Sequence, residues 1–409
     1  MKINLKTVKK NIYYLMLCLI LVMFTDTLWI RHANLNRFYL IIGLGIMTVL
    51  IGLQKCNKKD LQALILCILP IIMTMLVNID LNTLILFKIS LIIIGWTIIN
   101  KTNLEKLIHY YISLMVFIAI FSLVCMLLRQ AIVAMDFIPT IDSGSYGTKI
   151  LFFSNVKIGT GNLYFLRNQG PFWEPGVYQA YLNIALIFLL FSEVKRKQKI
   201  IDITILCITV ISTISTTGYI VLGIILIAKL FSVEHTTIRS KLLISVGFIV
   251  VVLIALNNET INFLLFDKMN FSSENSISNV TRLYSIIQNG KGIIQNPIFG
   301  IGPQAYATLF EESTSIWGAV STGVNTTTSL SVWALYGMLY FIIFNLGLFF
   351  FSKSFGESKV VLILIFIAIL IIYNTENLNY SIFFNFLTLC GFLKKGGNLF
   401  ESSSNIHSF

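Results

Sequence analysis

The sequence predicts an all-α integral membrane protein that crosses the bilayer many times. Of its 409 residues, 56% are hydrophobic and only 12% are charged, whereas a soluble domain carries roughly 25% charged residues. The mean hydropathy is +0.84, and the apolar runs that recur along the chain have no polar face. Because lipid offers no partner to an open backbone, the spanning segments must be helices.

About twelve segments have the length that a bilayer requires, roughly 17–25 residues with a few shorter ones. They lie near residues 11–30, 37–54, 61–78, 82–99, 108–128, 172–191, 200–214, 217–231, 242–256, 328–351, 360–373 and 379–393. The first segment has a basic lead but no small-residue cleavage site, which favours an uncleaved anchor over a signal peptide. We therefore expect a single membrane domain over residues 1–409.

The distribution of Lys and Arg predicts that both termini are cytoplasmic. With the N-terminus inside, about 20 of the 30 basic residues fall in the inner segments, as the positive-inside rule requires. The net charge of +12 is then a topology signal and an attraction to anionic membrane lipids. No basic run is interleaved with stacking aromatic residues, so we expect no nucleic-acid partner.

Two outer loops stand out by their length, residues 129–171 and 257–327. The second exceeds 60 residues, and loops of that size are usually functional or carry their own structure. Within it, an apolar stripe predicts an interfacial helix near 279–295, too polar and too short to span. No Cys, His or Asp cluster has ligand spacing, so we expect no metal and no cofactor.

The first outer loop ends in the stretch RNQGPFWEPGVY, which leads into the span at 172–191. Glu174 precedes a proline and is therefore biased away from helical backbone. It occupies the N-cap position with Pro175 as the first helical residue, so its carboxylate is expected to cap the helix near the positive pole. Arg167 lies just before it on a loop, and Trp173 is expected at the membrane interface.

The second outer loop contains SNVTRLYSIIQNGKGIIQNPIFGIGPQAY. Arg282, Gln288 and Lys291 are available on or beside the polar side of the expected interfacial helix. A turn then follows at Asn-Pro, and Gly300 and Gly302 allow the backbone to approach another group closely.

These two motifs, R-x-x-G…E-P entering a span and R…P-x-x-G-x-G in a large outer loop, resemble the O-antigen polymerase and O-antigen ligase superfamily. The resemblance to its Wzy-type polysaccharide polymerases implies a GT-C-like fold. It also implies a metal-independent glycosyltransferase acting on saccharides carried by undecaprenyl pyrophosphate at the outer face of the bacterial inner membrane. The product would be O-antigen, capsule or a similar surface polysaccharide. A flippase and a chain-length regulator are the partners implied, and Arg167 and Arg282 would hold the pyrophosphate.

The residues suggest how such a transfer would run. Two arginines match the phosphates of the leaving group, and Glu174 is the candidate base for the acceptor hydroxyl; Glu311 and Glu312 are substitutes. One base suffices because the pyrophosphate leaves without a proton, which predicts inversion at the anomeric carbon. The expected substrate-binding residues are Trp173, Tyr178, Lys291, Gly300 and Gly302.

Several alternatives remain open. Arg167 alternatively lies among lipid headgroups, Arg282 on a solvated helix face, and Glu174 only caps its helix. The ligases of the superfamily typically use a histidine in the large loop, and the chain has none there. A lipid-linked oligosaccharide flippase or a membrane scaffold are the rivals from other classes.

Two charged residues, Asp26 and Lys88, fall inside expected spans, where a charge costs roughly 2.5–3.5 kcal/mol or more. They either pair with each other or line a wet cavity. Lys88 alternatively marks a helix end.

Overall fold

The computed structural model describes residues 5–32, 37–51, 58–142, 147–159, 166–192, 196–232, 277–314, 325–355 and 358–393. The expected span at 242–256 and parts of the second outer loop (257–276 and 315–324) lie outside these residues.

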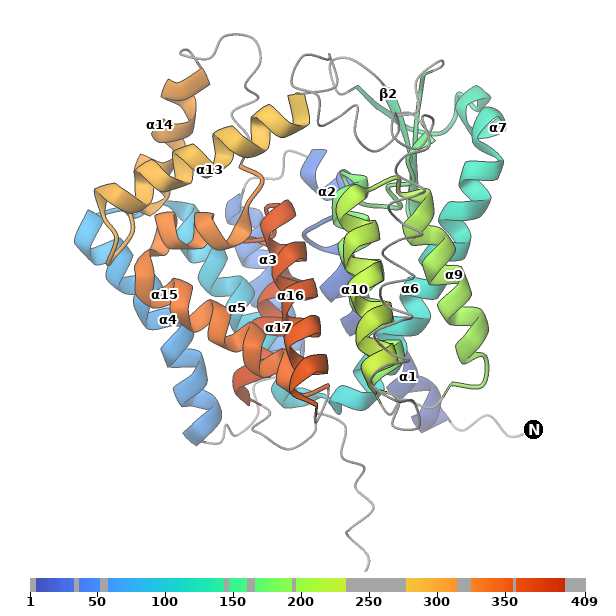
Figure 1. The fold of residues 1–409 in the computed structure, drawn as a ribbon, viewed down its shortest axis with the longest axis horizontal. Coiled ribbons are helices and arrows are strands. Elements are labelled where there is room, and N and C mark those ends of the chain that lie inside the picture. Colours follow the sequence, from blue (N-terminus) through green and yellow to red (C-terminus); the bar gives the residue numbers. More distant parts are fainter. Residues whose placement is uncertain are drawn as a thin grey trace, which may run out of the picture.

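The described part of the chain is mostly helical, and its long helices run between two ends of the molecule (Figure 1). Each of the other eleven expected spans overlaps a helix. The helices in these spans are α1 (Leu5–Met23), α3 (Arg37–Ile51), α4 (Lys58–Asn78), α5 (Thr83–Lys101), α6 (Leu104–Leu127), α8 (Pro175–Phe191), α9 (Lys199–Ser212), α10 (Thr216–Ser232), α15 (Thr328–Lys353), α16 (Lys359–Thr375) and α17 (Ile382–Leu393). The other described helices are α2 (Leu28–His32), α7 (Arg129–Ala134), α13 (Ile277–Gln295) and α14 (Gly302–Thr314).

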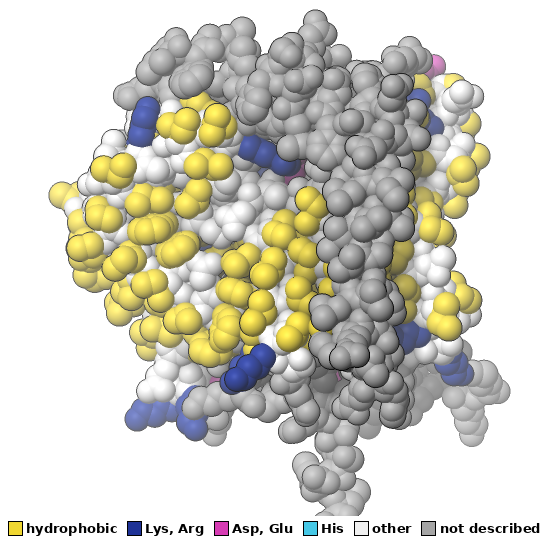
Figure 2. Space-filling model, viewed as in Figure 1, with side chains coloured by type: hydrophobic (Ala, Val, Ile, Leu, Met, Phe, Trp, Pro, Cys, Tyr) yellow, Lys and Arg dark blue, Asp and Glu magenta, His cyan; other side chains and the backbone are white. Residues whose placement is uncertain are grey.

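Four of the described helices are long and apolar enough to cross a membrane: α4, α5, α6 and α15. Five shorter apolar stretches lie in α3, α8, α10, α16 and α17. Figure 2 shows hydrophobic side chains covering the middle of one face, with Lys and Arg above and below them. Exposed Leu and Ile residues of α4, α15 and α16 contribute to the apolar exterior of the molecule. Such a belt between basic margins is typical of a membrane protein.

A small antiparallel sheet departs from the all-α expectation and lies in the first outer loop. Its strands are β1 (Thr140–Asp142), β2 (Gly147–Leu151) and β3 (Ser154–Lys157), in that order. The backbone N–H of Asn155 donates to Gly170 O (2.7 Å), and its side-chain amide donates to Phe172 O (3.2 Å). Leu28 N–H donates to Pro171 O from the other side (3.0 Å). The loop before α8 is therefore held between the sheet and the start of α2.

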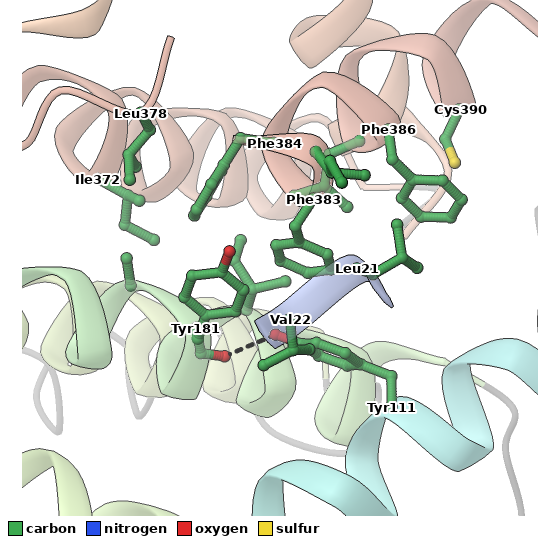
Figure 3. Close-up of a cluster of buried hydrophobic side chains, with 14 of the residues drawn as sticks. Leu21, Val22, Tyr111, Tyr181, Ile372, Leu378, Phe383, Phe384, Phe386 and Cys390 are labelled. Atoms are coloured by element: carbon green, nitrogen blue, oxygen red, sulfur yellow. Dashed lines mark hydrogen bonds between the residues drawn. The ribbon is translucent and has the colours of Figure 1, made fainter. Parts of the chain in front are cut away.

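The aromatic core behind this loop joins α6, α8 and α17 (Figure 3). The Tyr181 ring stacks on Phe172 at 4.5 Å and on Phe383 at 4.9 Å between ring centroids. Tyr111 donates its hydroxyl hydrogen to Tyr181 O (2.9 Å) and stacks on Phe383. Stacked rings fix the relative rotation of the helices as well as burying apolar area, so α8 and α17 are held in one register.

Helix α15 is broken at Gly337, whose φ is 81°. The turn after α13 fills the break, because Ile301 N–H donates to Ala334 O (2.8 Å) and Met338 N–H donates to Pro297 O (2.9 Å). Backbone groups that the break would leave unpaired are thus satisfied by another segment, as membrane depth demands. The turn predicted at Asn-Pro therefore has a structural role, because it supplies the hydrogen-bond partners that the break in α15 would otherwise lack.

Helix α13 occupies the range where we expected an interfacial helix. Its apolar residues Leu283, Ile286 and Ile294 are exposed, while Ser285 and Asn289 are buried against the start of α15. Asn289 donates to Asn325 Oδ1 (3.0 Å) and accepts from the Tyr306 hydroxyl (2.9 Å). The polar side of α13 faces the protein, so Gln288, expected to be available there, is enclosed at 1% exposure.

Candidate active site

The stretch FWEPG forms the beginning of α8. Glu174 is extended (φ −141°, ψ 151°) in the N-cap position, and Pro175 follows as the first helical residue, as predicted. The side chain of Glu174 makes no capping hydrogen bond, so that part of the expectation is wrong. The carboxylate is exposed instead, and the backbone carbonyl of Glu174 accepts from Val177 and Tyr178 N–H (both 3.2 Å).

A second carboxylate, Glu376, lies directly on this helix start. It follows the last residue of α16 and is 8% exposed. Its Oε1 contacts Gly176 so closely that a Cβ at that position would overlap with it. The backbone carbonyl of Glu376 accepts from the Thr328 hydroxyl (2.5 Å), which in turn accepts from Leu378 N–H (2.8 Å). The start of α15 therefore holds the backbone that carries Glu376.

Three arginines from three different segments act on Glu376 through their positive charge: Arg282, Arg167 and Arg31. Arg31 also interacts with Glu174. These five residues, Arg31, Arg167, Arg282, Glu174 and Glu376, are called the arginine–glutamate cluster below. Two of the three catalytic residues predicted from the sequence, Arg167 and Arg282, thus act on the same carboxylate, and the third, Glu174, lies beside it.

Two of these arginines are fixed by neighbours outside the cluster. Arg167 Nε–H donates to Thr213 O (3.2 Å), between α9 and α10. The Arg31 guanidinium lies flat over the Trp173 ring, with its central carbon 3.3 Å from the ring centroid. An arginine stacked on an aromatic ring keeps its donors directed outward in the ring plane and loses little entropy on binding an anion. Trp173 thereby contributes to the site through Arg31.

Burial raises the pKa of Glu376 well above its ordinary value, and the negative charge of Glu174 raises it further. Arg282, Arg167 and Arg31 lower the pKa but do not offset the loss of solvent. Removing a carboxylate from water penalises its charged form. Glu376 therefore holds a proton over a pH range in which an exposed glutamate is ionised.

Buried polar contacts anchor the segment that follows Glu376. Lys88, fully buried in α5, donates from Nζ to Asn379 O and Oδ1 (2.7 Å each) and to Asn385 Oδ1 (2.8 Å). Asp26 accepts from the hydroxyls of Tyr181 and Ser381. The alternative that Asp26 and Lys88 pair with each other is wrong, because each is held separately by this segment. Both charges thus fix the connection between α16 and α17.

The remaining predicted residues are dispersed. Tyr178 is completely buried, with its hydroxyl 3.0 Å from Ser122 Oγ, and Lys291 is exposed on α13. Gly300 (φ 72°) packs on the backbone of Leu335 at the break in α15.

Gly302 (φ 75°) lies against Asp80, which accepts from Gln304 N–H at the start of α14 (2.8 Å). Both glycines therefore have packing reasons for lacking a side chain, independent of any ligand. Glu311, one of the substitute bases, is exposed on α14, and the side chain of Glu312 lies outside the described residues.

Reasoning from the sequence missed Glu376 and Arg31. Glu376 lies in NTENLNYS, a mostly polar stretch of eight residues between two apolar runs. Intramembrane or juxtamembrane polar runs are costly and often functional, so this run was a usable signal. Arg31 carried no such signal, because a single arginine beside a span is ordinary and its stacking on Trp173 depends on the tertiary fold.

Among the residues that the structure describes, no group of three or more His, Cys, Asp or Glu side chains could hold a metal ion. What the cluster offers is a set of guanidinium groups beside two carboxylates. Guanidinium groups bind phosphate oxygens in a bidentate manner, and a carboxylate can accept a proton from a hydroxyl. The arrangement suits a reaction in which a phosphate leaves and a hydroxyl attacks.

Comparison with known proteins gives no further assignment. No protein-family model matches the chain. A search of curated proteins also finds no match.

Proposed function

We propose that this protein is a membrane glycosyltransferase that polymerises oligosaccharide repeat units carried on undecaprenyl pyrophosphate. The observation that carries the proposal is the arginine–glutamate cluster, in which Arg31, Arg167 and Arg282 act electrostatically on Glu376, and Arg31 also acts on Glu174. Phosphate binding and proton acceptance are the two tasks that transfer from a pyrophosphate-linked donor requires. The resemblance of the two loop motifs to the polymerase superfamily supports the same reading.

The location of the cluster fits a lipid-anchored substrate. Glu174 and Glu376 lie at the ends of α8 and α16, two apolar helices, and Arg282 lies in the first half of α13, whose apolar side is exposed. Arg31 lies in α2 and Arg167 in the loop before α8. A lipid carrier keeps its pyrophosphate at the membrane surface, level with helix ends. The Lys and Arg distribution supports placing this end on the outer face, with both termini in the cytoplasm. The bacterial inner membrane is what the resemblance to the polymerase superfamily implies.

The reaction follows from the charges. The arginines bind the pyrophosphate and stabilise the negative charge that develops as the glycosidic bond breaks. A carboxylate of the cluster takes the proton of the acceptor hydroxyl, whose oxygen attacks the anomeric carbon. The electron pair of the broken C–O bond leaves with the pyrophosphate, which needs no proton. A single displacement of this kind inverts the anomeric configuration.

A flippase is the rival with a structural feature in its favour, the break in α15, since interrupted helices are common in transporters. Here, however, the turn at Pro297–Ile301 fills the break through backbone hydrogen bonds. A ligase of the same superfamily would act on the same kind of donor. The polymerase is favoured because the large outer loop has no histidine.

The fate of lipid-linked saccharides in cells lacking the protein tests the proposal. Single repeat units on the outer face, with the long polymer lost, are the expected result. Long polymer that remains on the lipid carrier indicates a ligase, and single repeats retained on the inner face indicate a flippase. Unchanged saccharides in the deleted strain contradict all three. Re-expression of the wild-type chain is the control and must restore the ladder.

A further inference from the structure

We infer that Glu376, rather than Glu174, is the general base of the proposed transfer, and that the charge of Glu174 affects how readily Glu376 accepts the proton. The inference rests on the proposed function and assigns the proton-accepting step to one of the two carboxylates. It reverses the expectation from the sequence, in which Glu174 was the candidate because it belongs to a motif.

The first argument is position relative to the arginines. The positive charges of Arg282, Arg167 and Arg31 all act on Glu376, and Arg31 also acts on Glu174. A base must lie within hydrogen-bond reach of the attacking hydroxyl, which itself must lie next to the leaving group. Glu376 is the carboxylate on which all three of these arginines act, so a hydroxyl that attacks beside a phosphate bound by them would lie near it.

The second argument is how firmly each carboxylate is held. Glu376 is 8% exposed, contacts Gly176 directly, and sits on a backbone fixed by Thr328 on one side. Lys88 fixes the same connection on the other side through Asn379. Glu174 is exposed, and its side chain makes no capping hydrogen bond. Catalytic groups need supports that limit their motion, and only Glu376 has them.

The third argument is protonation. Burial and the charge of Glu174 raise the pKa of Glu376, and a base is most effective when its pKa lies nearer the working pH. Four charged groups determine this pKa: Glu174 raises it, and Arg282, Arg167 and Arg31 lower it. Binding of a pyrophosphate between the arginines offsets their positive charge and raises the proton affinity of Glu376 at the moment when the proton is transferred.

The step is balanced within the proposed reaction. The acceptor hydroxyl gives its proton to the Glu376 carboxylate as its oxygen bonds to the anomeric carbon. The bond from that carbon to the pyrophosphate oxygen breaks, and its electrons leave with the pyrophosphate. The protonated Glu376 then releases the proton to water, aided by the positive charges of the arginines once the pyrophosphate has left.

The test compares isosteric variants of the two carboxylates in the purified full-length chain. The substrate is the lipid-linked oligosaccharide extracted from cells that lack the protein, and the rate of its polymerisation is measured across pH. Glu376→Gln is expected to lower kcat by about 10²–10⁴-fold. The fold-loss in kcat for Glu174→Gln is expected to be at least ten times smaller. Glu105→Gln, an exposed glutamate at the start of α6, is the matched control and should retain the wild-type rate.

The pH profile separates catalysis from mere structure. The wild-type rate should rise with pH as Glu376 ionises, and Glu174→Gln should move this limb to lower pH because it removes a charge that raises the pKa of Glu376. If the wild-type chain polymerises the substrate and Glu376→Gln does so at the same rate, the assignment of the base is contradicted but the proposed function is not. Equal losses in both variants also contradict it. A wild-type chain without transfer activity contradicts the proposed function as well.

Discussion

Oε1 of Glu376 rests against Gly176, so the Glu376 carboxylate joins the end of α16 to the backbone at the start of α8. Any residue larger than glycine at this position would overlap with the carboxylate. The contact places Glu376 at the N-terminal end of α8, beside Glu174, and within the field of three arginines. The E-P-G motif therefore serves partly to make room for a carboxylate from a distant part of the chain.

Gly176→Ala is expected to displace the Glu376 carboxylate and to reduce polymerisation by about 10²-fold, as a misplacement of about 1 Å does in other enzymes. The measurement is the rate with lipid-linked oligosaccharide. Gly290→Ala is the matched control, because no atom lies within 4 Å of the added Cβ and glycine is also unfavourable in that helix. Equal rates for the Gly176→Ala variant and the wild type would show that this contact has no functional role.

The raised pKa of Glu376 also predicts how stability depends on pH. A carboxyl whose pKa is higher in the folded than in the unfolded state binds its proton more tightly when folded. Its contribution to the free energy of unfolding is fully present below the ordinary glutamate pKa of 4.5 and is lost as the pH rises through the pKa of the folded state. The melting temperature of the wild-type chain should therefore fall as the pH rises through this range. In Glu376→Gln, the part of the fall that is due to Glu376 should be absent. Superimposable curves for the two chains would count against the raised pKa.

Lys88→Met should lower the stability of the protein by about 3 kcal/mol, because it leaves the buried side-chain oxygens of Asn379 and Asn385 without their Nζ donor. Thermal unfolding in detergent is the measurement. Lys101→Met, in the last turn of the same helix, should cost less than about 1 kcal/mol. If both variants unfold at the same temperature, Lys88 is not the anchor that the hydrogen bonds suggest.

Gly300→Ala should destabilise the fold by at least about 1–2 kcal/mol, since its backbone is left-handed and the added Cβ would overlap with Leu335 O. Gly45→Ala on α3 is the control, with no atom within 4 Å of the new Cβ. The measurement is the melting temperature of each variant, which should be lower for Gly300→Ala than for Gly45→Ala. A Gly300→Ala chain with normal stability but no activity would instead favour the substrate-binding role expected from the sequence.

Much of the helical framework followed from the sequence, because long apolar runs leave few alternatives to helices. The start of α8 was predictable to the residue, since Pro175 fixes the first turn. The sheet at Thr140–Lys157 was not, because its three strands are short and its segment contains a mixture of charged and apolar residues. The break at Gly337 also escaped notice, since it becomes possible only when the turn at Pro297–Ile301 supplies its hydrogen bonds.

The candidate site was predictable in part. Arg167 and Arg282 were chosen from motifs, and they act on a common carboxylate. That carboxylate is separated from Arg282 by 94 residues of chain (376 − 282), and no periodicity connects them. Tyr178 illustrates the opposite case: a tyrosine one turn into a span suggests a hydroxyl at the surface, but the first outer loop covers it completely.

The most direct test of the account is the length distribution of surface saccharide in deleted cells that express Arg282→Ala or Arg282→Lys at the wild-type level. The alanine variant removes a phosphate-binding group and should leave single repeats on the lipid carrier. The lysine variant retains the charge but not the bidentate geometry, so a shortened ladder is expected. A full ladder with Arg282→Ala would contradict the assignment of the arginine–glutamate cluster as the site of polymerisation.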